Sequence, residues 1–107
     1  MPADPPYEVI ADPATSSVRL MLSGEIDIAM TDHLGDAVER ALVDRPDTVV
    51  ADFAGVTFMD STGIRFLVGF KTRCDSIGAA WGLENVSTSI IRLIEVSGLT
   101  DFLQPTR

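Results

Sequence analysis

The chain has 107 residues, of which 46% are hydrophobic, and it carries a formal net charge of -8 at pH 7. This size suits one compact domain with a single core, and the apolar content excludes a chain that is disordered over most of its length. The acidic balance argues against nucleic acid and anionic membrane surfaces as partners, and it favours a basic protein surface.

The first part of the sequence predicts a hairpin followed by a helix. Residues 1–6 are rich in proline, so we expect a flexible N-terminus ahead of one folded domain at 7–107. Apolar residues over 7–11 and in alternation over 18–22 predict two paired strands. After a break, apolar residues at steps of three and four predict an amphipathic helix over 30–42. Asp27 or Thr31 can cap the start of this helix, and Arg45-Pro46-Asp47 closes it.

The middle of the sequence predicts a second strand and helix pair. The β-branched run over 48–53 is typical of a strand that is covered on both faces. Residues 54–60 are predicted to form a loop. Helical spacing begins again at Ser61 and ends at Gly78.

The last part predicts a weaker strand over 79–83 and a third helix that begins after Ser87. Gly98 suits the left-handed residue just beyond the end of a helix. A final short strand or extended tail is expected to close the core. The apolar residues expected for this helix and tail are Ile90, Ile91, Leu93, Ile94, Val96, Leu99, Phe102 and Leu103.

This order of elements predicts a single α/β domain with one sheet edge that carries polar residues. Strand–helix–strand units favour parallel strands, whose carboxyl ends meet at one edge. Asp27, Ser61 and Ser87 each stand at a following helix start, so we expect them to gather there. Open α/β sheets place their binding sites at such an edge.

The segment Phe58-Met59-Asp60-Ser61-Thr62-Gly63-Ile64 is the most informative one. Asp60 and Ser61 are both good helix caps, and a structural cap is one interpretation. The other is a phosphorylation site, because free backbone N–H groups and the helix dipole stabilise an anion at a helix start. A phosphate adds about -1.5 to -2 charge, which beside Asp60 would alter what this edge can bind.

Four motifs together resemble the STAS domain family and, within it, the bacterial anti-sigma factor antagonists. The resemblance spans roughly residues 7–104 in the family's order and spacing. In chain order the motifs are Gly24-Glu25-Ile26-Asp27, Val49 to Phe53, Asp60-Ser61-Thr62-Gly63-Ile64 and Ile91 to Leu99.

The resemblance implies a mixed sheet of four to five strands with an N-terminal hairpin and three to four packed helices. It also implies a partner-switching cycle in the regulation of transcription under stress. An anti-sigma factor that is an ATP-binding serine/threonine kinase binds the unmodified antagonist, which frees a sigma factor. Phosphorylation of Ser61 releases the antagonist, and a phosphatase resets it. The implied partner-binding residues are Asp27, Asp60, Ser61, Thr62 and Gly63.

Three positions depart from the usual family pattern. Ile26 replaces the usual Leu, and Ser87 stands where many relatives have Pro before the third helix. Thr62 is often Ser in relatives, which makes it a second candidate acceptor, although the motif favours Ser61. We expect a monomer or a weak homodimer.

Other functions fit the sequence less well. A hydrolase built on Ser61 and His33 lacks the glycine-flanked elbow, because Met59 stands where glycine is needed. A receiver phosphorylated on Asp52 or Asp60 needs a lysine after its last strand, whereas Lys71 falls within a helix. No phosphate loop is found, and we expect no catalytic residue, cofactor or metal.

Two readings concern the place of the protein in the cell. Cys74 is the single cysteine, and we expect it to be a buried and inert thiol. No leader and no apolar run of bilayer length is found, so we expect a cytoplasmic protein.

The alternative function is an unphosphorylated STAS scaffold subunit of a lipid transporter or a signalling complex.

Overall fold

A computed structural model describes residues 6–103, which form one α/β domain with a four-stranded mixed sheet. The strands lie in the order β1-β2-β3-β4, with β1 antiparallel to β2 and the other pairs parallel. This confirms the predicted fold class. The flexible segment predicted at residues 1–6 lies, apart from Pro6, outside the described residues. The elements are β1 (Tyr7–Asp12), β2 (Ser17–Ile26), the 3₁₀ helix η1 (Ile28–Met30), α1 (Thr31–Leu42), β3 (Thr48–Met59), α2 (Ser61–Ser76), β4 (Ala80–Glu84), α3 (Thr88–Val96) and the 3₁₀ helix η2 (Thr100–Leu103).

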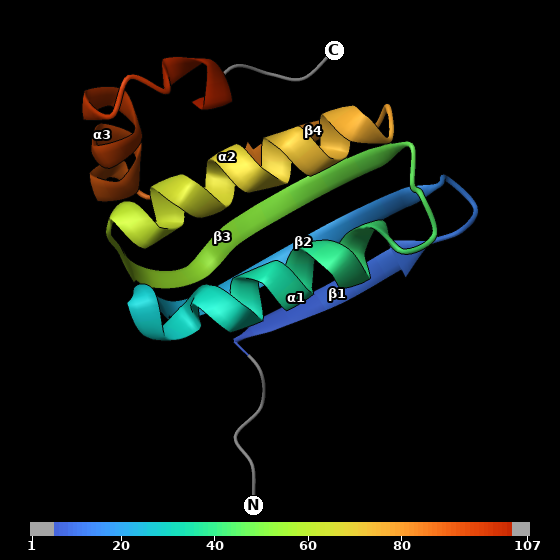
Figure 1. The fold of residues 1–107 in the computed structure, drawn as a ribbon, viewed down its shortest axis with the longest axis horizontal. Coiled ribbons are helices and arrows are strands. Elements are labelled where there is room, and N and C mark those ends of the chain that lie inside the picture. Colours follow the sequence, from blue (N-terminus) through green and yellow to red (C-terminus); the bar gives the residue numbers. More distant parts are fainter. Residues whose placement is uncertain (1–5, 104–107) are drawn as a thin grey trace, which may run out of the picture.

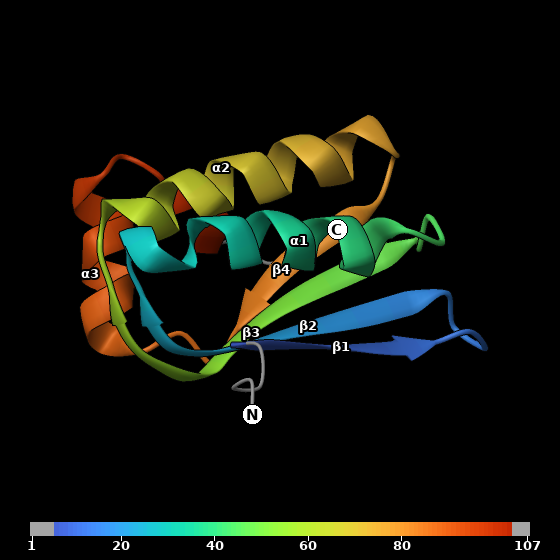
Figure 2. The ribbon, with the colours of Figure 1, turned by 60° about the horizontal axis from the view of Figure 1, so that its bottom comes forward.

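The core lies between the sheet and one layer of helices. Helices α1 and α2 run side by side over the same face of the sheet, and α3 lies at one end (Figures 1 and 2). Leu20 of β2 and Val49 of β3 point into this core and are fully buried. The opposite face of the sheet is covered by no helix among residues 6–103, so the expectation of a strand covered on both faces is wrong. Its polar residues, Arg19 and Asp52, shield each other instead.

The predicted hairpin is confirmed. β1 and β2 pair from Tyr7↔Leu22 to Asp12↔Ser17, in an unbroken register. The side chain of Asp12 accepts a hydrogen bond from the backbone N–H of Ala14 at 3.0 Å, which tightens the connecting turn.

The loop predicted at residues 54–60 is wrong, because β3 continues to Met59. This part of β3 pairs with a continuation of β2 to Ile26, through two register shifts that break the alternation of buried and exposed side chains. Gly55 permits the close approach, since a Cβ there would lie 3.0 Å from the Cβ of Ser23. The irregular pairing explains why no strand period is visible in the sequence.

The C-terminal part differs from the prediction in two respects. The 3₁₀ helix η2 stands where a short strand or an extended tail was expected, and its Phe102 closes the core with 5% exposure, as predicted. Val96, expected on the apolar face of α3, is 77% exposed. Gly98 has a positive φ of 78°, as predicted for the residue beyond a helix end. Within the described range, no helix is both long and apolar enough to cross a bilayer.

Candidate functional site

The carboxyl ends of β2 and β3 create an edge where two helix starts meet (Figure 1). Ile26 and Met59, the last residues of these strands, are partners in the sheet. One more backbone hydrogen bond follows, from the N–H of Asp60 to the carbonyl of Ile26 at 3.2 Å. The residues after both strands are therefore held together at one place, as predicted. We call Asp27, Asp60, Ser61, Thr62 and Gly63 the Ser61 edge.

Asp60, rather than Ser61, is the cap of helix α2. Its carboxylate accepts a hydrogen bond from the backbone N–H of Thr62 at 2.8 Å, and its carbonyl accepts one from Gly63 at 3.0 Å. Ser61 is the first residue of the helix and is exposed. Because Asp60 already caps the helix, the Ser61 hydroxyl is not needed for that structural role.

The next two residues face inward. Thr62 is only 5% exposed, so its hydroxyl is far less accessible than that of Ser61. Gly63 is buried against Met59, and a Cβ at Gly63 would lie 2.0 Å from the Cγ of Met59. Only glycine fits here while the Met59 side chain keeps its place.

Asp27 and Ser87 also stand at helix starts. Asp27 caps the short helix η1, where its carboxylate accepts from the N–H of Ala29 at 3.0 Å, so α1 itself begins without a side-chain cap. Ser87 caps α3 through the N–H of Ile90, at 3.4 Å. Both views place α3 at the same end of the molecule as the starts of α1 and α2 (Figures 1 and 2).

Exposed apolar side chains flank the Ser61 edge. Ile28 follows Asp27 and is 76% exposed, and Phe58 precedes Met59 and is 48% exposed. The edge therefore combines two carboxylates, an accessible hydroxyl and apolar surface. Such a mixture suits a protein partner better than a small polar substrate.

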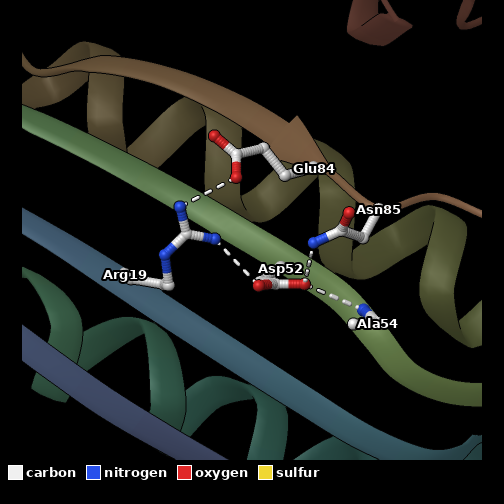
Figure 3. Close-up of polar contacts among 5 residues, drawn as sticks. All are labelled: Arg19, Asp52, Ala54, Glu84 and Asn85. Carbon is white, nitrogen blue, oxygen red and sulfur yellow. Dashed lines mark hydrogen bonds and ion pairs between the residues drawn. The ribbon is translucent and has the colours of Figure 1, made fainter.

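A polar network on the open face of the sheet supports the segment that leads to α3 (Figure 3). Asp52 accepts hydrogen bonds from the guanidinium of Arg19 at 2.8 Å, from the amide of Asn85 at 3.0 Å and from the N–H of Ala54 at 2.9 Å. Arg19 also pairs with Glu84 at 2.8 Å. Three neighbouring strands are thereby tied together.

Asp52 stays ionised in this setting. Its burial alone would raise the pKa of the carboxyl, but the hydrogen bonds from Asn85, Ala54 and Arg19 outweigh that effect and hold the pKa below its ordinary value. Asn85, with a positive φ of 57°, connects this carboxylate to the turn before α3. No sequence pattern predicts this network, because its members are brought together only by the sheet register.

The remaining candidates of the sequence analysis are placed apart from one another. His33 is exposed on α1, and Lys71 pairs with Asp75 along α2. Cys74 is fully buried, as expected, and burial raises the pKa of its thiol to about 11. Among the residues that the structure describes, no cluster of three or more His, Cys, Asp or Glu could hold a metal ion.

Comparison with known proteins matches residues 9–107 to the STAS domain. The anti-sigma-B factor antagonist of Bacillus subtilis (strain 168) is 28% identical over 88 residues, which cover 82% of this chain and 80% of that protein.

Two solved structures share the fold. The unphosphorylated anti-sigma factor antagonist SpoIIAA has a TM-score of 0.75 at 20% identity, over 92% of this chain and 85% of that one. A sulfate transporter family protein from Wolinella succinogenes has a TM-score of 0.72 at 19% identity, over 89% of this chain and 75% of the other.

Proposed function

Because this chain belongs to the STAS domain family, we propose that it is an anti-sigma factor antagonist and that Ser61 is its phosphate acceptor. The observation that carries the proposal is the accessible hydroxyl of Ser61 at the first position of α2, next to a cap that Asp60 supplies. The neighbouring Thr62 is buried, which favours Ser61 as the acceptor.

The switch follows from charge at the helix start. The unphosphorylated Ser61 edge offers a partner a small hydroxyl, with exposed apolar residues on the segments that adjoin the edge. A phosphate adds about -1.5 to -2 charge together with three acceptor oxygens. The dipole of α2 stabilises this charge within the protein, whereas Asp60 and Asp27 give the surface further negative charge. A partner that fits the hydroxyl form meets extra bulk and repulsion in the modified form.

The proposed partner is an anti-sigma factor that is also an ATP-binding serine/threonine kinase. ATP belongs to that partner, and the antagonist contributes the acceptor hydroxyl and a docking edge. A phosphatase returns Ser61 to the hydroxyl form. In this cycle the antagonist sequesters the anti-sigma factor only while Ser61 is free.

The test is phosphorylation by purified anti-sigma factor kinases from the source organism in the presence of ATP. We expect intact mass to rise by one phosphate, peptide mapping to place it on Ser61, and Ser61→Ala to abolish it. Calorimetry should show tight binding by Ser61→Ala and at least tenfold weaker binding by Ser61→Asp. Equal affinities of the two variants, or phosphate on Thr62 alone, would contradict the proposal.

A second candidate is a STAS subunit that is never phosphorylated, such as a transporter partner or a scaffold. The likeness to a sulfate transporter family protein supports this candidate at the level of the fold. It would be favoured if no anti-sigma factor kinase bound the chain or modified Ser61.

A further inference from the structure

Helices α1 and α2 run side by side in both views (Figures 1 and 2), and residues of both line a groove. Its volume is about 340 Å³, and its apolar floor consists of Leu34 and Val38 from α1 with Phe66 and Phe70 from α2. These four side chains are at most 7% exposed, so they form a firm surface that belongs to the core. A space of this size accepts a large apolar side chain and part of its flanking segment.

Two glycines keep this groove open. Gly35 of α1 and Gly69 of α2 both line it, and a Cβ at either position would meet no atom within 4 Å. Glycine is among the poorest residues for a helix interior, and neither position has the positive φ or the close contact that would require it. The fold therefore leaves room here that its own packing does not use.

The start of the groove carries a cationic side chain. Thr62 lines the groove and is 5% exposed, so the groove begins directly beside Ser61. Arg65 lies one turn further along the groove, is exposed and takes part in no ion pair within the described part of the chain. At the other end, Arg73 is already paired with Glu39 across the two helices. The exposed guanidinium of Arg65 suits a carboxylate.

We propose that this groove is a second docking site for the anti-sigma factor and that it receives an apolar side chain whose segment also carries an acidic residue. The inference rests on the proposed function and extends it beyond the Ser61 edge. Thr62 directly follows Ser61, so a partner seated on the acceptor reaches the groove without crossing a gap. The occupant lays its apolar side chain between Gly35 and Gly69 and places its carboxylate on Arg65. A helix in a groove is a common form of such recognition.

The test fills the groove from one wall. Gly69→Phe adds a large side chain where a Cβ has free space, so the fold can accept it. Thr72→Phe is the matched control, because Thr72 is exposed on the same helix and does not line the groove. Each unphosphorylated full chain is titrated calorimetrically with the anti-sigma factor kinase that binds the wild type. We expect Gly69→Phe to weaken binding about 30-fold and Thr72→Phe to change it less than about twofold.

The charge component has its own pair of variants. Arg65→Gln should weaken binding about tenfold and lower its dependence on salt, since one charge contact is lost. Lys71 is exposed on α2 outside the groove, so Lys71→Gln should leave the affinity and its dependence on salt unchanged. Equal effects of the two substitutions would overturn the assignment of the carboxylate to this end of the groove.

Three results would overturn the docking site. In the first, Gly69→Phe binds the kinase as tightly as Thr72→Phe does, and the kinase still phosphorylates Ser61 of the wild type. Only the inference about the groove then fails. If no anti-sigma factor kinase binds the wild type, the proposed function fails together with it. If Gly69→Phe instead abolishes self-association in sedimentation, the groove receives a second copy. Should Gly69→Phe not fold, Gly35→Leu fills the groove from the opposite wall.

Discussion

Removal of the Asp52 carboxylate tests whether the network on the open face stabilises the fold. Asp52→Ala removes the acceptor for three donors, on Arg19, Asn85 and Ala54. Loss of a hydrogen bond to a charged group costs about 1.5 to 3 kcal/mol. Arg19 is 38% exposed and keeps Glu84, so it regains water and the full cost of an orphaned buried charge does not apply. We expect a loss of about 2 to 3 kcal/mol in the free energy of unfolding.

Glu84→Ala is the matched comparison, because it removes the other carboxylate that contacts Arg19. Glu84 is 48% exposed, and exposed ion pairs contribute about 0.2 to 1 kcal/mol. Urea unfolding at pH 7, followed by circular dichroism, measures both variants under the same conditions. A loss for Asp52→Ala no greater than that for Glu84→Ala would refute the reasoning.

The stabilisation by Asp52 should also depend on pH, which a comparison of the wild type with Asp52→Ala measures. The pKa of Asp52 is lowered in the folded state, so its stabilisation is fully present above the unfolded value of about 3.9 and is lost as pH falls through the lower folded value. The stability difference between wild type and Asp52→Ala should therefore be constant from about pH 7 to pH 5 and shrink below about pH 4. A difference that grows on acidification would show that the carboxylate is not the stabilising form.

Two further predictions concern the helix α2. Gly63→Ala should destabilise the fold by about 1 to 3 kcal/mol, because the new methyl overlaps the side chain of Met59. In a chain that already carries Met59→Ala, the Gly63→Ala substitution should be nearly neutral. Urea unfolding of the single and double variants measures this coupling, and additive losses would contradict it. Cys74 should react with a thiol reagent at pH 8 only at the rate at which the protein opens, since its thiol is fully buried and has a pKa of about 11; a reaction as fast as in denaturant would contradict the buried position.

Much of the fold was predictable because its elements carry regular periods. The strand over 18–22 alternates, and the helices show apolar steps of three and four with glycines near their ends. The second half of β3 was not predictable, because Gly55 and the shifted register with β2 remove the alternation. Val96 was misplaced because it follows the buried Ile94 by two residues, about 200° around α3, which puts it on the side away from the core.

The site was predictable in its position more than in its details. Asp60 and Ser61 follow a strand and begin a helix, which placed them at the sheet edge. The sequence left open which of them caps α2, and only the contact between Asp60 and the N–H of Thr62 decides it. Arg19 and Asp52 are 33 positions apart, so nothing short of the strand register brings them together. The same holds for Gly35 and Gly69 of the groove, which lie on different helices.

Met59 and Gly63 interlock where β3 passes into α2, and the N–H of Asp60 still bonds to the neighbouring strand. These contacts fix the backbone between β3 and Ser61, so we expect this segment to keep its conformation when Ser61 is modified. A group added there has no backbone movement to trigger. It acts by changing what the surface presents, and the free and modified chains should keep superimposable backbones.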